Sequence, residues 1–170
     1  MRRALDRLYD TAAVLAAVFM VGTLAMILLG IGGRLLHFHV PGTDAYAGYC
    51  MAAAGFLALA STLRHGEHIR VTLLLERVGP TARRRLELWA LSAGTLLACL
   101  FAGYSVRLAW QSHDFNDVST ASDATPLWLP QLSMALGTLI LAIAFVDMLV
   151  NRWRGNGVTP MAPVSSGFHE

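Results

Sequence analysis

Four long apolar stretches, none of which contains a charged residue or a histidine, dominate this chain. They cover residues 11–33, 45–63, 88–106 and 127–146 and are 19 to 23 residues long. About 20 apolar residues in a helix, rising 1.5 Å each, cross the roughly 30 Å hydrocarbon layer of a bilayer. The sequence therefore predicts an all-α integral membrane protein with four transmembrane helices.

The composition agrees with this class and leaves no room for a second domain. The chain of 170 residues is 55% hydrophobic and 14% charged, with a mean hydropathy of +0.52, whereas soluble domains average about 25% charged residues. We expect a single membrane domain over residues 1–154. Residues 155–170 are rich in Gly, Pro and Ser without periodicity, which predicts a disordered cytoplasmic tail. The first stretch is longer than the roughly 7–15 residues of a signal-peptide core, so we expect it to be retained.

The positive charge is strongly asymmetric. All thirteen basic residues are arginine, and eleven lie before the first stretch, after the second or after the fourth; only Arg34 and Arg107 lie on the opposite side. Short loops rich in Lys or Arg stay in the cytoplasm, so we predict a bacterial inner-membrane protein with both termini cytoplasmic. The arginines line membrane edges instead of forming one patch, which argues against nucleic acid and for contact with membrane lipid. The four tryptophans also fall at predicted interfaces: Trp89, Trp110, Trp128 and Trp153.

The loop between the second and third stretches carries an amphipathic pattern. Its apolar residues follow the i, i+3, i+4, i+7 spacing of one helix face: Val71, Leu74, Leu75 and Val78. We therefore predict a short interfacial helix on the cytoplasmic leaflet, ended by Gly79-Pro80. A plain loop with incidental leucines is the alternative.

Small residues recur at helical spacing and favour close helix approach. They are Gly48, Ala52, Gly55 and Leu59 in the second stretch, and Gly94, Ala98 and Ala102 in the third. Residues 107–125 read as an exposed loop on the outer side. Because an interior proline costs a hydrogen bond, Pro130 predicts that the fourth helix begins nearer Leu129 or is kinked.

No pattern in the chain indicates catalysis or a cofactor. The apolar stretches lack the mid-membrane ionisable groups that mark ion or substrate pathways, and they contain no histidine that could ligate haem. His65 and His68 flank Glu67, but a zinc site needs further ligands in a supporting frame. No phosphate-binding loop, nucleophile elbow or Cys-x-x-Cys is present. We expect neither an enzyme nor a metal or cofactor site, and the residues alone predict a four-helix membrane subunit or scaffold.

Residues 44–71 resemble the small membrane subunit (DctQ-type) of tripartite ATP-independent periplasmic, or TRAP, transporters. In that family an acidic residue, more often Glu, starts the second helix, and Asp44 stands there in this chain. The second helix of the family ends in a basic-Gly-x-His-Ile-x-Val run, which this chain matches with Arg64, Gly66, His68, Ile69 and Val71. The fourth helix of the family opens with Leu-x-x-Pro, matched by Leu127 and Pro130, with Gly137 further in. The resemblance covers roughly residues 5–152.

The resemblance implies a role in a three-part uptake system. A periplasmic binding protein would deliver an organic acid, a large multi-span permease would import it with sodium, and the small subunit would brace that permease. Asp114 and Asp117 would then help to dock the binding protein. The candidate partner-contact or structural residues are Asp44, Arg64, Gly66, His68, Ile69, Val71, Leu74, Leu75, Pro130 and Gly137.

Three other functions fit the hydropathy pattern. An autonomous small four-helix transporter would need an embedded carboxylate, which the first stretch lacks. A membrane assembly or anchor protein would need no transport partner, and an electron-transfer anchor would show haem absorbance.

Overall fold

The structure, a computed structural model, describes residues 2–38, 40–64, 80–120 and 124–154. Four long helices account for most of them: α1 (Arg2–Leu35), α2 (Thr43–Arg64), α4 (Pro80–Asp114) and α5 (Trp128–Trp153). All four are long and apolar enough to cross a membrane, which confirms the predicted all-α fold with four spans. Within the described ranges no strand occurs, only an isolated bridge between Val118 and Pro126. The interfacial helix predicted at 71–78 and the tail at 155–170 lie outside these ranges.

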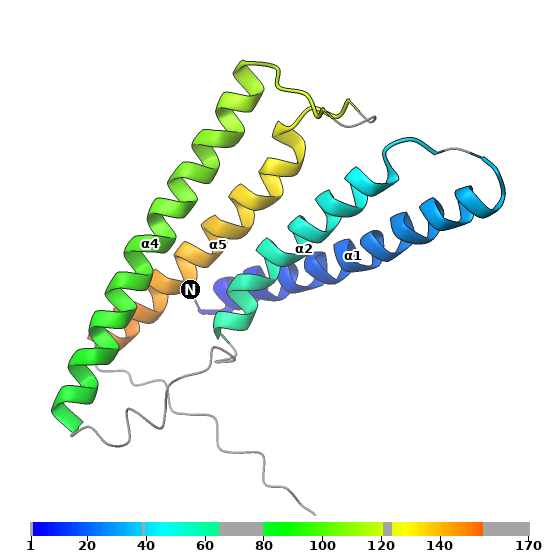
Figure 1. Cartoon of the computed structure of the whole chain (residues 1–170). Coiled ribbons are helices and arrows are strands. Elements are labelled where there is room, and N and C mark those ends of the chain that lie inside the picture. Colours follow the sequence, from blue (N-terminus) through cyan, green and yellow to red (C-terminus); the bar gives the residue numbers. More distant parts are fainter. Residues whose placement is uncertain (1, 39, 65–79, 121–123, 155–170) are drawn as a thin grey trace, which may run out of the picture.

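The helices form an open layer in the order α1, α2, α5, α4 (Figure 1). Helix α2 lies between α1 and α5, and α5 lies between α2 and α4, so α1 and α4 occupy the two edges. The α1–α2 and α4–α5 hairpins diverge towards the ends that carry their turns. We call that side the turn end and the side where α1 begins the N-terminal end.

Helices α2 and α5 run in the same direction and meet where α5 carries Gly137. A Cβ atom built on Gly137 would lie 2.5 Å from both the carbonyl carbon and the carbonyl oxygen of Phe56. Real Cβ atoms do not approach backbone this closely, so the helix axes can come together only because this position has no side chain. Small residues serve the same purpose at other membrane-helix contacts.

Two apolar clusters extend the packing to the remaining helices. Gly94 of α4 faces the ring of Phe145, and Ala98 and Ala102 pack against Ala142 of α5. The small-residue face predicted for the third stretch is thus the one that α4 turns towards α5. At the N-terminal end a second cluster joins α1, α2 and α5: Tyr9, Ala60, Leu63 and Ala144.

Helix α4 extends well beyond the apolar stretch at both ends. It continues to Asp114, so the prediction that residues 107–125 form a loop is wrong for the first eight of them. Outside the hydrocarbon layer polar residues no longer prevent a helix, and the backbone of α4 simply continues. The turn comes at Asn116, whose φ is 51°, and the Asp117 amide donates to the Ser112 carbonyl at 3.0 Å, a helix-ending arrangement.

Helix α5 begins at Trp128, one residue before the predicted Leu129. Pro130 is its third residue and so lies in the first turn. The first four amides of a helix have no partner within it, and the missing N–H of proline therefore costs no hydrogen bond at this position.

Exposed tryptophans flank the apolar stretch of α4. Trp89 and Trp110 are 72% and 70% exposed. Their positions differ by 110 − 89 = 21 residues, or about 32 Å of helix, close to the thickness of the hydrocarbon layer. Tryptophan prefers the membrane–water interface, so this spacing is consistent with a membrane-spanning α4.

We predict that Gly137→Ala lowers the thermal stability of the chain, because the new methyl group would overlap the Phe56 backbone. Overpacking of this kind costs about 1–3 kcal/mol, which would lower the melting temperature by several degrees. Gly103→Ala is the matched control, since a Cβ there meets nothing within 4 Å. Circular dichroism melts of the full chain in detergent would measure both; equal melting of Gly137→Ala and the parent chain would contradict the close contact.

Candidate functional site

The candidate sites lie on the exterior of the layer. The middle of each helix is apolar, and much of this apolar surface is exposed. In the most apolar stretches of α1 and α4 only 6% and 11% of the residues are buried. Large side chains such as Val18, Leu24, Leu97 and Leu100 are exposed there. In a bilayer such surface is covered either by lipid or by another protein.

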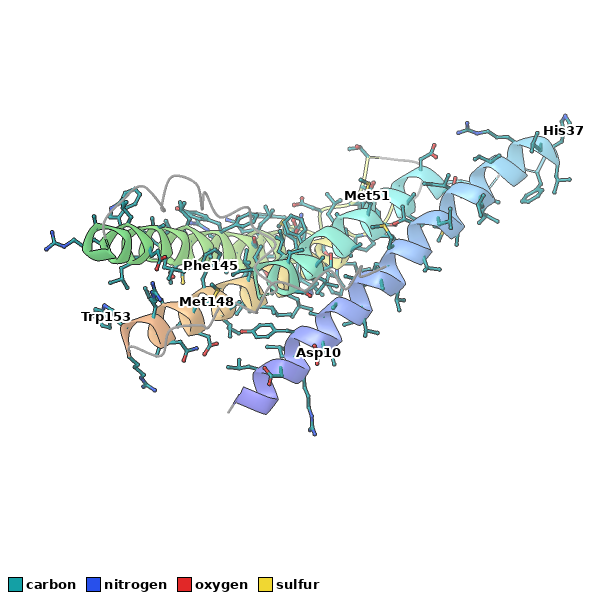
Figure 2. The ribbon with its side chains drawn as sticks, turned by 90° about the horizontal axis from the view of Figure 1, so that it is seen from below. Asp10, His37, Met51, Phe145, Met148 and Trp153 are labelled. Atoms are coloured by element: carbon teal, nitrogen blue, oxygen red, sulfur yellow. The ribbon has the colours of Figure 1, made fainter. Side chains whose placement is uncertain are left out.

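One exposed surface differs from the rest because its residues are small. It is the face of α2 formed by Gly48, Ala52 and Gly55, which we call the small-residue face. All three are exposed, and a Cβ on either glycine would meet nothing within 4 Å. Met51 borders this face, and Figure 2 shows it on the side of α2 away from α1.

The sequence correctly singled out this face as small, but within the described ranges the chain does not use it for its own packing. Helix α2 contacts α1 and α5 through other residues, which include Ala53, Leu57 and Ala60. The small-residue face is therefore available to a helix from outside the chain.

An ion pair fastens the α4–α5 hairpin at the N-terminal end. The Arg152 guanidinium donates to the Glu87 carboxylate, and the two side chains are 31% and 22% exposed. This pair was not predicted from the sequence, since Arg152 was assigned to the topology signal and was not connected with Glu87. A usable signal was present: the two residues carry opposite charges at the ends of antiparallel helices that a short connection brings together.

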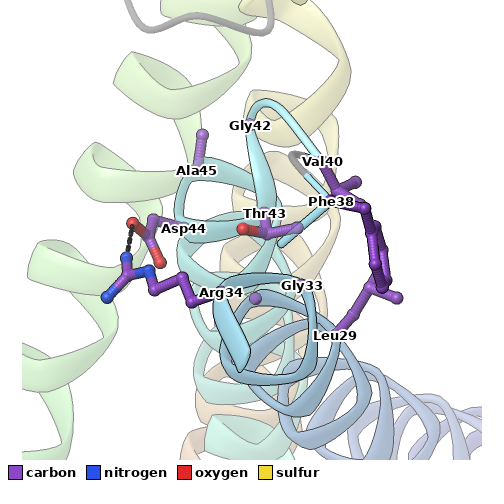
Figure 3. A pocket seen from close by; sticks show the side chains of 10 residues that line it. Leu29, Gly33, Arg34, Phe38, Val40, Gly42, Thr43, Asp44 and Ala45 are labelled. Atoms are coloured by element: carbon purple, nitrogen blue, oxygen red, sulfur yellow. Dashed lines mark hydrogen bonds and ion pairs between the residues drawn. The ribbon is translucent and has the colours of Figure 1, made fainter. Parts of the chain in front are cut away.

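The turn end of the α1–α2 hairpin holds a pocket of about 280 Å³ (Figure 3). Arg34 and Asp44 form one side, with the guanidinium 3.5 Å from the carboxylate. Phe38 and Leu29 form the opposite side, across Gly33 and the nearly buried Thr43.

The loop between α4 and α5 is tied to α2. The Ser119 amide donates to the Thr125 carbonyl at 2.8 Å, and the Leu127 amide donates to the Asp117 carbonyl at 2.9 Å. The Thr125 hydroxyl donates to the Tyr46 hydroxyl at 3.0 Å. These bonds hold the loop, and with it Asp117, next to the first turn of α2.

The predicted site residues do not form one cluster. Asp44 lies in the pocket at the turn end, and Pro130 and Gly137 lie in α5, where Gly137 makes an internal contact. Arg64 is the last residue of α2. The other predicted residues lie outside the described ranges: Gly66, His68, Ile69, Val71, Leu74 and Leu75.

Comparison with protein families gives one match. The model of the family described as "Tripartite ATP-independent periplasmic transporters, DctQ component" matches residues 23–155, more than half of the chain. Comparisons with curated proteins and with solved structures found no match.

Reversing either charge of the Glu87–Arg152 pair should destabilise the hairpin, whereas reversing both should restore most of the loss. We expect Glu87→Arg and Arg152→Glu each to lower the free energy of unfolding by about 1–3 kcal/mol. Each change leaves two like charges side by side in a partly buried position. Thermal melts of both single variants and the double variant provide the measurement. Arg154→Glu, at an exposed position, is the control; no recovery in the double variant would argue against the pair.

Proposed function

Since this chain belongs to the DctQ family and is a small subunit of tripartite ATP-independent periplasmic transporters, we propose that it braces the large transport subunit. The large subunit would import an organic acid with sodium, after a periplasmic binding protein delivers the substrate. The small subunit would hold the fixed part of the large subunit in the membrane, so that only the transporting part moves.

The small-residue face of α2 carries this proposal. Small residues in membrane helices allow backbones to approach closely and thereby drive helix association. Gly48 and Gly55 have no such role among the residues that the structure describes, because nothing lies within 4 Å of a Cβ at either position. A helix of the large subunit seated here would give these glycines a packing role.

The neighbouring surfaces are less suitable for a close helix contact. Gly103 of α4 is also in open space, but three of the four residues one turn away from it are large: Leu100, Val106 and Arg107. A partner helix would meet these side chains before it reached the α4 backbone. Lipid, which adapts to an uneven surface, suits that side of the layer better.

The distribution of charge supports bracing over direct transport. Transport pathways for ions or acids usually contain ionisable groups in the middle of the membrane. Residues 11–33, 45–63, 88–106 and 127–146 contain no Asp, Glu, Lys, Arg or His. Handling of substrate and sodium would therefore belong to the large subunit.

A second contact is proposed for the segment after α2. The resemblance places Arg64, Gly66, His68, Ile69 and Val71 in the family's run, and Leu74 and Leu75 follow in the amphipathic pattern. We propose that this segment lies along the inner membrane surface against the large subunit. Normal assembly and uptake with His68→Ala would remove the case for that histidine.

The arginines support an orientation with both termini in the cytoplasm. Arg7, Arg85, Arg152 and Arg154 belong to the N-terminal end of the layer, whereas Arg34 and Arg107 belong to the turn end. Basic residues are retained on the cytoplasmic side, so the turn end would face the periplasm. Asp117 and its hydrogen-bonded loop would then lie where the binding protein docks.

The bracing proposal predicts that Gly55→Leu prevents assembly. In cells that express the large subunit, omission of the small subunit should lower both the amount of large subunit and uptake. Gly55→Leu should reduce co-purification of the two subunits roughly 5- to 150-fold, since overpacking by about 1–3 kcal/mol changes an equilibrium constant by that factor.

Gly103→Leu provides the matched control, because it places the same side chain at another exposed helical glycine. It should co-purify like the parent chain, and both variants should melt like the parent when alone. Unchanged large-subunit amount and uptake without this chain would refute bracing. Equal effects of the two leucine variants would refute the assignment to α2.

The orientation predicts which sites a membrane-impermeant thiol reagent can reach in intact cells. In a chain whose two cysteines are replaced by alanine, a new cysteine at Ser119 should be labelled from outside. One at Asn156 should be labelled only after the membrane is permeabilised. The opposite labelling pattern would show that the turn end faces the cytoplasm and would contradict the proposed orientation.

A further inference from the structure

We propose that the pocket at the turn end of α1 and α2 binds the headgroup of a zwitterionic phospholipid. This inference concerns a membrane ligand of the small subunit itself and does not rest on its contact with the large subunit. It rests on the pocket's paired charges, its size and the apolar surface beside it.

The charges at the pocket match a zwitterion better than an anion. Arg34 and Asp44 stand side by side, with 3.5 Å between the guanidinium and the carboxylate. A lone phosphate or carboxylate attracted by Arg34 would be repelled by Asp44. A phosphoethanolamine group carries both charges and can place its phosphate on Arg34 and its ammonium on Asp44.

The Arg34–Asp44 pair is also free to exchange partners. The two side chains are 78% and 88% exposed, and exposed ion pairs contribute little stability. Arginine binds phosphate through paired N–H donors. A phospholipid headgroup can therefore replace the internal contact at little cost.

The interior of the pocket has one polar group close to these charges. Thr43 is only 8% exposed, and its hydroxyl has no hydrogen-bond partner among the residues the structure describes. Figure 3 shows this hydroxyl directed towards the side of Arg34 and Asp44. It is placed to donate to a phosphate oxygen.

The size of the pocket favours a ligand that is only partly enclosed. Its volume of about 280 Å³ lies just below the roughly 300–1,000 Å³ of most small-molecule sites. It can accept a headgroup, while the rest of a larger molecule stays outside.

An exposed apolar track leads from the pocket along α1. Leu29 lines the pocket, and Ala25, Val18 and Val14 continue the same helix face; all four are exposed. Over these 29 − 14 = 15 residues the helix rises about 22 Å, more than the roughly 15 Å of one bilayer leaflet. This surface suits an acyl chain, which a soluble zwitterion such as an amino acid lacks.

Native mass spectrometry of the full chain in detergent can test the site. Phosphatidylethanolamine and phosphatidylglycerol with identical acyl chains would be added in equal amounts. We expect the parent chain to retain the ethanolamine lipid preferentially. Arg34→Gln should reduce this retention severalfold, because it removes the charged donors that would hold the phosphate. Asp44→Asn should abolish the preference between the two lipids.

Arg107→Gln is the control, because it removes the other arginine of the turn end without touching the pocket. It should retain lipid like the parent chain. Equal losses in Arg34→Gln and Arg107→Gln would overturn the site, as would equal retention of both lipids by the parent chain. Displacement of the lipid by free phosphoethanolamine at similar concentration would show a solute site instead. If Arg34→Gln fails to fold, Asp44→Asn still tests the proposal. An unchanged preference of Asp44→Asn for phosphatidylethanolamine over phosphatidylglycerol would overturn it.

Discussion

The contact of α5 with α2 at Gly137 is the interaction on which the arrangement of the layer depends. Helix α5 is the only element that contacts both α2 and α4 extensively within the described part of the chain. The hydrophobic effect does not hold helices together inside a bilayer, so close backbone approach and shape must do so. With Gly137 against the Phe56 carbonyl group and Ala142 against Ala98 and Ala102, α5 uses small residues on both of its sides.

An open layer has consequences for what the chain can do. A closed four-helix arrangement would bury most of its apolar residues internally, whereas this layer leaves α1 and α4 largely uncovered. Such a protein presents a broad apolar surface to its surroundings. This surface and membership of the DctQ family are the basis on which we propose a bracing role.

The sequence predicted some features of the structure and could not predict others, for physical reasons. The four spans were recognisable because membrane helices must be apolar over a fixed length. The extension of α4 to Asp114 was missed because polar residues beyond the interface are equally compatible with helix and loop. The order of the helices could not be predicted, because Gly55 and Gly94 lie in similar patterns of small residues. In the structure Gly94 faces Phe145, whereas Gly55 faces outward. The Glu87–Arg152 pair depends on that order.

The order of the helices also affects the sequence of steps in which the chain inserts and folds. Each hairpin, α1–α2 and α4–α5, joins helices that are neighbours in sequence, but the contact that unites the hairpins links Phe56 to Gly137, 137 − 56 = 81 positions later. Contacts between distant segments form late, and here the contact must await insertion of the last helix. Until then Ala60 of α2 lacks Ala144 of α5, against which it packs in the finished layer. A nascent chain stalled before α5 would therefore carry an unmatched helix face, a feature by which membrane quality control could tell incomplete from complete subunits.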